Sequence, residues 1–402
     1  MTRLSALMAA RLHGPRFFAI TMSMAAAAAL AACAQTGTGS AAAPATAITT
    51  PASDTVPSVA APVAPAGTWM KLPAAPITTA PGMITSVWTG REMIIRGLQF
   101  LPLGGWRGVT FAYRPASRAW VRLAAGPQSP GTTFQTSDVA VWTGSRMLVA
   151  GLTNGSYDPA ANTWRAIPRP AGSMSGAVTG WTGRQFLAWG GACCEDTTRG
   201  GLAYTPATGT WRAIPAAPLA SRTRASGAWT GKELVVAGGS NYHKAFRDAA
   251  AYNPSAGTWR KLPSMPGTAI GWPALWDGRE ALFLSTSSAR GMAYNPARNH
   301  WRLLPAMPLP RSEFAATWTG HRVLVWGGLS YRYPTWSAPA HGEAYNPAAN
   351  LWTALPVSPL RGRALPTAVW TGRQMIVWGG SFLQQEPSVS SADGTAYTPR
   401  TP

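Results

Sequence analysis

The chain has 402 residues and carries 34 Lys and Arg against 14 Asp and Glu, which gives a formal net charge of +20 at pH 7. A surface this basic favours acidic partners such as anionic lipid, acidic glycan or nucleic acid. The basic residues are spread along the chain, with no long basic run and no nucleic-acid module signature, so we expect no nucleic-acid partner.

The first 32 residues predict a signal for export. Residues 1–16 contain three arginines and no acid, and the apolar segment 17–32 is too short and Ala-rich to favour a membrane-spanning helix. The sequence Leu30-Ala31-Ala32-Cys33 resembles the bacterial lipoprotein cleavage box, which implies that Cys33 is acylated and becomes the first mature residue. Ordinary cleavage near Ala31 with an incidental cysteine is the alternative. Either way we expect the protein in the bacterial cell envelope, at the outer membrane or cell surface if it is anchored.

Residues 33–66 consist almost entirely of Ala, Thr, Pro, Ser, Gly and Val, and Asp54 is the only charged residue. Such a segment has too little large apolar surface to fold, and its prolines keep it extended. We therefore expect a disordered tether between the lipid anchor at Cys33 and a folded domain over residues 67–402.

Four short apolar runs separated by turns recur along the chain, most clearly from Ala316 to Pro356. Runs this short, bounded by Gly and Asn-Pro, predict strands of a meander rather than helices. The first run ends in Trp-Thr-Gly, or once Trp-Asp-Gly, beginning at Trp88, Trp142, Trp181, Trp229, Trp276, Trp318 and Trp370. The third run ends in Tyr-x-Pro, beginning at Tyr113, Tyr157, Tyr204, Tyr252, Tyr294, Tyr345 and Tyr397. The fourth run begins at Trp69, Trp120, Trp164, Trp211, Trp259, Trp301 and Trp352.

The phase of these signatures predicts how the repeat closes. The mean repeat is about 47 residues, in the range of four-stranded propeller blades. Trp69 precedes every Trp-Thr-Gly, and no fourth signature follows Tyr397. Because a three-stranded last blade would leave an open edge, we expect the strand from Thr68 to Pro73 to complete it. The prediction is an all-β, seven-bladed β-propeller closed by an N-terminal strand.

The repeat resembles the kelch family over roughly residues 67 to 400. The resemblance rests on the later Tyr, the later Trp and a glycine pair after the second strand. The pair occurs at Gly190-Gly191, Gly238-Gly239, Gly327-Gly328 and Gly379-Gly380. Three blades depart from it, with Gly97-Leu98, Gly151-Leu152 and Ser285-Thr286, and we expect distortion at that corner.

The connections predict which end of the ring carries function. Tight turns join the first to the second strand and the third to the fourth, and both lie at one end, which we call the constant face. Connections between the second and third strands and between blades vary in length and share the other end, the variable face. Binding usually resides on variable loops held by a rigid scaffold.

The variable face collects the Trp and Tyr residues that the repeat does not use. These are Trp106, Trp272, Trp336, Tyr242, Tyr331 and Tyr333. Exposed, they would stack on sugar rings or on a partner protein. Alternatively, long loops fold over them as small satellite cores.

Arginines join these aromatic residues. Arg222, Arg311 and Arg363 each stand seven residues before the first-strand Trp, and Arg224 and Arg361 lie beside them. A ring of guanidinium groups above the axis would bind a carboxylate or phosphate. In the alternative, the arginines pair with Glu313 or with loop carbonyls and brace the ring.

No catalytic constellation emerges. The acids expected on the variable face are Asp138, Glu195, Asp196, Asp248, Glu313, Glu343, Glu386 and Asp393, and no two have a spacing that identifies a mechanism. Copper oxidases of the galactose oxidase kind share kelch blades, and His243, His341, Tyr242 and Tyr331 resemble their ligand set only weakly. We predict no cofactor and no metal.

The dipeptide Cys193-Cys194 is compatible with a strained vicinal disulfide outside the cytoplasm, or with two separate thiols. The leading hypothesis is a monomeric envelope lipoprotein whose propeller is a binding scaffold for an acidic glycan or an envelope protein. The alternative is a sugar-active enzyme, because the chain also resembles periplasmic sialic acid mutarotases, although their family pattern has six blades.

Overall fold

The computed structural model describes residues 67–77, 82–100, 106–127, 138–151, 153–172, 174, 176–191, 200–241, 243–286, 290–332, 335–382 and 391–400. The predicted signal, the predicted tether and Cys33 lie outside these residues. All regular secondary structure in the described ranges is β-strand. Those ranges contain no helix with the length and apolar character needed to cross a membrane.

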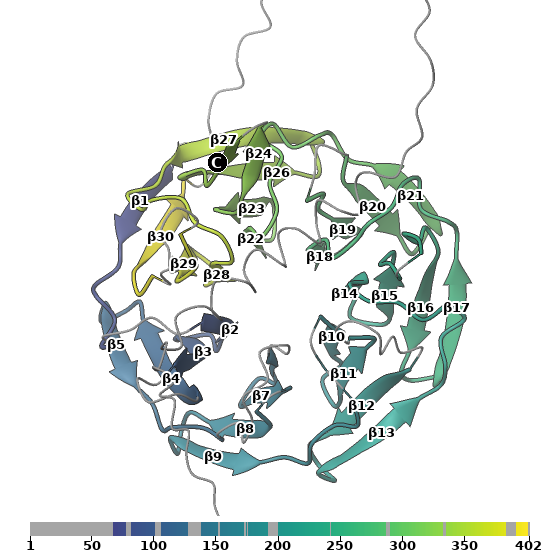
Figure 1. The fold of residues 1–402 in the computed structure, drawn as a ribbon, viewed down its shortest axis with the longest axis horizontal. Helices are drawn as coiled ribbons and strands as arrows, with labels where there is room; N and C mark the ends of the chain where they lie inside the picture. The colour runs from purple at the N-terminus through teal and green to yellow at the C-terminus, as the bar shows by residue number, and fades with distance from the viewer. Residues whose placement is uncertain are drawn as a thin grey trace, which may run out of the picture. The chain divides into compact units, whose positions relative to one another are not determined.

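The strands form seven four-stranded antiparallel sheets, each a blade of a propeller (Figure 1). Blade 1 contains β2 (Gly82–Trp88), β3 (Met93–Phe100), β4 (Trp106–Arg114) and β5 (Ala119–Arg122). Blade 2 contains β6 (Val139–Trp142), β7 (Met147–Ala150), β8 (Gly155–Asp158) and β9 (Thr163–Ala166). Blade 3 contains β10 (Val178–Trp181), β11 (Phe186–Trp189), β12 (Gly201–Thr205) and β13 (Thr210–Ile214). Blade 4 contains β14 (Ser226–Trp229), β15 (Leu234–Ala237), β16 (Ala249–Asn253) and β17 (Thr258–Leu262).

Blade 5 contains β18 (Ala274–Trp276), β19 (Ala281–Phe283), β20 (Met292–Asn295) and β21 (His300–Leu303). Blade 6 contains β22 (Ala315–Trp318), β23 (Val323–Trp326), β26 (His341–Asn346) and β27 (Leu351–Val357). A separate hairpin of β24 (Ser330–Arg332) and β25 (Thr335–Ser337) lies between β23 and β26 in the chain. Blade 7 contains β28 (Thr367–Trp370), β29 (Met375–Trp378) and β30 (Gly394–Pro399), with β1 (Gly67–Lys71) as its fourth strand.

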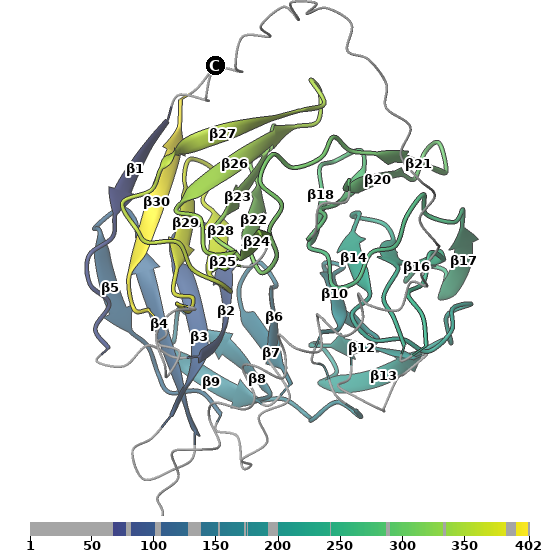
Figure 2. The same cartoon turned by 45° about the horizontal axis from the view of Figure 1, so that its top comes forward.

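The innermost strands surround the axis of the ring. Neighbours contact one another in the order β2, β6, β10, β14, β18, β22, β28 and back to β2. In blade 7, β1 pairs with β30 in an antiparallel register from Gly67 opposite Pro399 to Lys71 opposite Thr395. Figure 2 shows β1, β30, β29 and β28 side by side, together with the long β26–β27 hairpin of blade 6.

The core lies between blades rather than within them. The second strands β7, β11, β15, β23 and β29 are buried at every residue, because each blade faces a neighbour on both sides. One apolar cluster, for example, joins Val235 and Ala251 of blade 4 to Phe283 and Tyr294 of blade 5. A single flat sheet with two apolar faces cannot bury both alone, so each blade depends on its neighbours.

The fourth-strand tryptophans connect each blade to the one before it. Each packs at a tilt against the Tyr directly opposite in its own sheet, with ring centroids 4.9–5.2 Å apart. Each indole Nε1–H then donates, over 2.8–3.1 Å, to a carbonyl oxygen of the preceding blade. The acceptors of Trp69, Trp120, Trp164, Trp211, Trp259, Trp301 and Trp352 are Pro356, Pro73, Ala124, Pro168, Pro215, Pro263 and Pro305. One contact per interface recurs around the whole ring.

The glycine pair is required by close backbone packing. Both glycines of each pair have positive φ, and a Cβ on Gly239 would lie 2.7 Å from the Thr223 carbonyl oxygen. The Gly239 N–H donates to the Ala269 carbonyl of the next blade over 2.6 Å. Blade 1 lacks the pair, and there β3 and β4 continue as a ribbon that ends with Phe100 opposite Trp106. In blade 1, the distortion expected at that corner is therefore an extended hairpin.

Candidate functional site

Three buried arginines organise the variable face of blades 4, 6 and 7. Arg222, Arg311 and Arg363 are 0%, 1% and 1% exposed. Each Nε donates to the carbonyl two residues earlier, and each Nη1 donates to the first glycine of the pair in its own blade. That glycine lies 16 residues along the chain in all three blades. The arginines thus fix the corner between the blade-to-blade loop and the second strand.

An acid from the loop before the third strand, or from that strand itself, pairs with each arginine. Arg222 binds both carboxylate oxygens of Asp248, at 2.6 and 3.0 Å, and its guanidinium lies 4.1 Å from the centroid of the Phe246 ring. Arg363 donates through Nη1 to one carboxylate oxygen of Asp393. Burial alone would raise the pKa of Asp393, but hydrogen bonds from Arg363 and Ser391 hold it below its usual range.

Blade 6 pairs its arginine less completely. The Arg311 Nη2 to Glu343 Oε1 distance is 3.4 Å, and Arg311 Nη1 donates instead to the His341 carbonyl over 2.9 Å. Glu343 accepts the Leu309 N–H over 3.0 Å. Because Glu343 is 2% exposed, burial raises its pKa despite the nearby arginine. For His341, burial has the opposite effect and lowers the pKa, and the Arg311 charge lowers it further.

This geometry corresponds to the bracing alternative, with a different acid from the one expected. The arginines donate to loop carbonyls and form ion pairs with Asp248, Glu343 and Asp393, whereas Glu313 forms none of the ion pairs seen in the described ranges. Each guanidinium donates its hydrogen bonds within its own blade, and the Arg363 guanidinium also lies 6.0 Å from the Trp326 ring centroid of blade 6, so these donors are occupied by the fold. A ligand-binding role for them remains a prediction.

The remaining charged candidates lie at the entrance to the innermost strands. Arg224 is exposed, and Glu313 is half-buried, so burial raises the Glu313 pKa while the Arg224 charge opposes the shift. Both have positive φ, 52° and 56°, as does Leu365 at 51° in blade 7. All three stand five residues before the first-strand Trp, where blades 3 and 5 have Gly176 and Gly271 with φ of 66° and 63°. Arg361 is exposed and lies 5.3 Å from the Phe382 ring centroid.

The predicted aromatic residues divide between surface and core. Tyr331 in β24 and Trp336 in β25 are 49% and 45% exposed, and their ring centroids are 4.8 Å apart across the hairpin. Trp272 is only 7% exposed and packs in the main apolar core between blades 4 and 5 rather than in a satellite core of its own loop. Trp106 begins β4, but its side chain is not among those that the structure describes. Tyr242 and Tyr333 lie outside the described residues.

The predictions for Cys193-Cys194 and for a copper site concern residues that lie wholly or partly outside the described ranges. Cys193 and Cys194 are not among the described residues. Within the described ranges, no three His, Cys, Asp or Glu residues gather as a metal site would require. His243 is exposed and His341 half-buried, and no copper-oxidase constellation forms around either among those residues.

Sequence reasoning missed the partners of the arginines and the strained backbone at the axis. The constant interval between each arginine and its glycine was a usable signal, because it repeats in the three blades that combine both features. The acids had no such signal, since Asp248, Glu343 and Asp393 follow loops of different length. The left-handed conformation of Arg224, Glu313 and Leu365 was detectable only by aligning them with Gly176 and Gly271.

Comparison with known families gives one match. Residues 221–266 match the Kelch motif, and they span blade 4 with Arg222, the pair Gly238-Gly239, Tyr252 and Trp259. The comparison with curated proteins finds no match. The arrangement of the matched blade recurs in six further sheets around the ring. The chain is therefore a seven-bladed β-propeller built from kelch repeats.

Proposed function

We propose that this propeller is a binding scaffold of the bacterial cell envelope and that its variable face holds an envelope protein or an acidic glycan. The observation that carries the proposal is the β24–β25 hairpin, which presents Tyr331 and Trp336 as a half-exposed pair of rings in tilted contact. Aromatic side chains that remain exposed on a rigid element are typical of the anchors of binding surfaces, because they bury a large area at small entropic cost.

The position of the hairpin supports this proposal. It lies in the connection between β23 and β26, where a kelch blade has loops that can vary without disturbing the sheet. Its base is fixed, because Leu329 and Ser312 exchange backbone hydrogen bonds of 2.8 Å. A partner would therefore meet an aromatic surface that is already ordered, which lowers the cost of binding.

The enzyme alternative loses the feature that favoured it. A sialic acid mutarotase-like site needs free arginines that converge on an anionic sugar, whereas Arg222, Arg311 and Arg363 already donate to internal carbonyls and acids. Releasing one would leave a buried cation or a partly buried acid without its partner. The scaffold is accordingly the function that we propose.

The proposal has three further parts. Cys33 is acylated, residues 33–66 are a tether, and β1 closes the ring. The closing role is supported by the pairing of β1 with β30 and by the Trp69 bond to Pro356. Met70→Pro removes one backbone N–H inside β1 and should lower the midpoint of thermal unfolding by several degrees. An unchanged midpoint would argue against a closing role for β1.

The binding test compares two pairs of exposed apolar residues. A photo-reactive side chain at the exposed neighbouring position 335 should give a discrete cross-linked product in intact envelopes. In the same labelled protein, Tyr331→Ala combined with Trp336→Ala should abolish specific capture. The control pair Leu351→Ala and Val357→Ala lies on the outer strand β27, where the side chains are 47% and 74% exposed. An acidic glycan array run with the same three proteins distinguishes sugar from protein.

If the aromatic and control variants lost capture equally, exposed apolar surface in general would account for binding, and the proposal would be contradicted. Retention of the protein cross-link without array binding would select the envelope protein. Array binding that disappears in the aromatic variant alone would select the acidic glycan. The cross-link must be identified and be lost in the aromatic variant to count as support.

A further inference from the structure

The turn between the first and second strands is the most regular feature of the constant face. In every blade a Thr side-chain oxygen, or that of Asp277 in blade 5, accepts the backbone N–H groups two and three residues later. The glycine that follows has a φ between 87° and 99° in all seven blades. Seven copies of one pinned turn present their side chains at equivalent positions around the axis.

The residue after that glycine is basic in five blades. These residues are Arg91, Arg184, Lys232, Arg279 and Arg373; blades 2 and 6 have Ser145 and His321 there. All five cations are exposed, and none forms an ion pair with another described residue. We call these five residues the basic ring.

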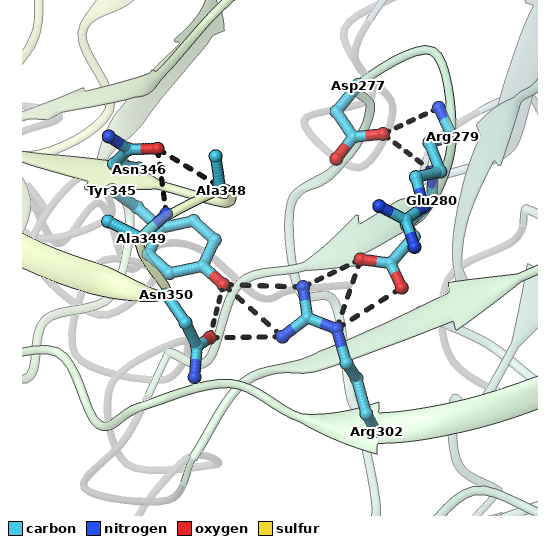
Figure 3. Close-up of polar contacts among 9 residues, drawn as sticks. All are labelled: Asp277, Arg279, Glu280, Arg302, Tyr345, Asn346, Ala348, Ala349 and Asn350. Atoms are coloured by element: carbon cyan, nitrogen blue, oxygen red, sulfur yellow. Dashed lines mark hydrogen bonds and ion pairs between the residues drawn. The ribbon is translucent and has the colours of Figure 1, made fainter.

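The next residue in the same turn has a different role. Glu92, Glu233 and Glu280 point to the outer strands and bind Arg114, Arg260 and Arg302 at 2.6, 2.7 and 2.6 Å. Figure 3 shows the third of these pairs, in which Arg302 also donates to Asn350 of the next blade over 3.0 Å. These three glutamates are thus paired with arginines that join strands and, for Arg302, neighbouring blades.

The cations of the basic ring consequently form none of the ion pairs seen among the described residues, although the Lys232 charge helps to lower the pKa of the adjacent Glu233. The only other acid in the seven inner turns is Asp277, whose carboxylate accepts two backbone N–H groups (Figure 3). The third-to-fourth strand turns and the end of β30 add exposed Arg118, Arg298 and Arg400 to the same face. The constant face is therefore positively charged both at the axis and further out.

The chain enters the propeller at this same end. Gly67, the first residue of β1, pairs with Pro399, where β30 ends at the constant face. The preceding segment, which we predict to carry a lipid at Cys33, joins the propeller there. A protein attached through that segment can bring its basic ring to the membrane while the variable face points outward.

We propose that the constant face docks on the surface of a bilayer that contains anionic phospholipids. The five cations are exposed and lie at equivalent positions of equivalent turns around one axis. Such a spread of exposed charge suits a plane of many phosphates better than one small anion. The interaction orients the scaffold and is independent of which partner the variable face binds. It rests on the envelope location in the proposed function, but it uses none of the same residues.

The test uses the full chain carrying Cys33→Ser, which cannot be acylated at that position. Binding to vesicles of phosphatidylcholine is compared with binding to vesicles that contain about one third phosphatidylglycerol. The protein should bind the anionic vesicles at least about tenfold more tightly, and about 0.5 M salt should abolish the difference because the Debye length falls to a few ångströms. Absence of a preference for anionic vesicles would overturn the proposal.

A matched pair of variants then locates the effect. The ring variant carries R91Q, R184Q, K232Q, R279Q and R373Q. The control carries R122Q, R165Q, R169Q, R212Q and K261Q, which remove the same charge from exposed positions in or just after the outermost strands. The ring variant should lose at least about tenfold in vesicle affinity and the control less than about threefold.

Equal losses in the two variants would assign binding to net charge and contradict docking through this face. A third arm measures retention on heparin. Loss of heparin binding in the ring variant with unchanged vesicle binding would assign the ring to an acidic polysaccharide instead. Failure at Tyr331 and Trp336 would leave these results unaffected, so the two proposals fail separately.

Discussion

Arg222 and Lys232 belong to the same blade and differ completely in their surroundings. Arg222, at the variable face, is 0% exposed and is enclosed by the carbonyls of Ala220 and Gly238 and by Asp248. Lys232, at the constant face, is exposed in a tight turn. The Thr230 hydroxyl of that turn accepts the backbone N–H groups of Lys232 and Glu233. Long loops can fold back and supply a buried cation with partners, whereas a tight turn has no spare chain with which to do so.

The same contrast holds between blades. At the variable face, an arginine and its acid stabilise one corner of one blade, as in Arg363 with Asp393. At the constant face, Arg302 and Arg260 reach from the acid of their own blade to the Tyr and Asn of the next. The ion pairs of the variable face thus remain within single blades, and backbone bonds such as Gly328 N–H to the Arg363 carbonyl join neighbours there. At the constant face, the side chains of the ion pairs themselves reach the next blade.

The largest expected effect separates the two kinds of cation. Arg222→Met should lower the free energy of unfolding by about 2–3 kcal/mol, because it leaves Asp248 and two carbonyls without a donor. The value lies below that for a fully buried pair because the Asp248 side chain is 44% exposed and water can solvate it. Arg184→Met, at the constant face, should change stability by less than about 0.5 kcal/mol.

Urea denaturation of both proteins measures this difference. The double variant R222M/D248N serves as a control, since removing both charges should recover part of the loss. Similar midpoints for the two single variants would show that the buried corner does not stabilise the fold.

Acidification should distinguish the carboxylates of the two faces. Hydrogen bonds from Arg260 hold the pKa of Glu233 below its usual range, and burial raises the pKa of Glu343 above it. Glu233 therefore contributes stability that is present above its unfolded pKa of about 4.3 and lost as the pH falls through its folded value. Glu343 contributes stability that is present below about pH 4.3 and lost as the pH rises through its folded value.

Glu233→Gln and Glu343→Gln should remove these two opposing slopes. Free energies of unfolding measured across the acidic range should fall less steeply with decreasing pH in the first variant. In the second, they should fall less steeply with increasing pH. Identical pH profiles for wild type and either variant would contradict the assigned shift for that residue.

The smallest expected effect concerns left-handed backbone. Gly183 at the constant face has a φ of 90°, and Leu365 at the variable face has a φ of 51° and is 60% exposed. Gly183→Ala should cost about 1 kcal/mol, since no neighbour compensates the strain of a side chain there. Leu365→Gly should raise stability by about 0.5 kcal/mol, because relief of the strain exceeds the added chain entropy.

Thermal unfolding measures both changes. If Leu365→Gly destabilised the protein, the Leu365 side chain would make packing contacts that outweigh its backbone strain. A gain in stability would mark Leu365, with Arg224 and Glu313, as a position where a side chain is kept at a cost in stability. Residues of that kind cluster at binding sites.

Much of the fold was predictable from residue types alone. Seven recurrences of Trp-x-Gly, Tyr-x-Pro and Trp place four strands in each repeat, and the structure has seven four-stranded sheets. These signatures are local, since each specifies a turn or a pair of residues directly opposite in neighbouring strands, as with Tyr397 and Trp69. The candidate site was less predictable, because Asp248 reaches Arg222 through a loop whose conformation no local rule specifies.

By itself, the sequence determined the number of repeats, the phase of the strands and the two kinds of connection, because periodic apolar runs and turn residues act over short distances. Only the tertiary structure decided which cations are buried and which are free. That outcome depends on where loops of irregular length return to the sheet, as they do around Arg222 and Arg363 and do not around Arg184 or Lys232. It also decided that Trp272 packs in the core while Trp336 stays exposed, since burial follows from neighbours that are distant in sequence.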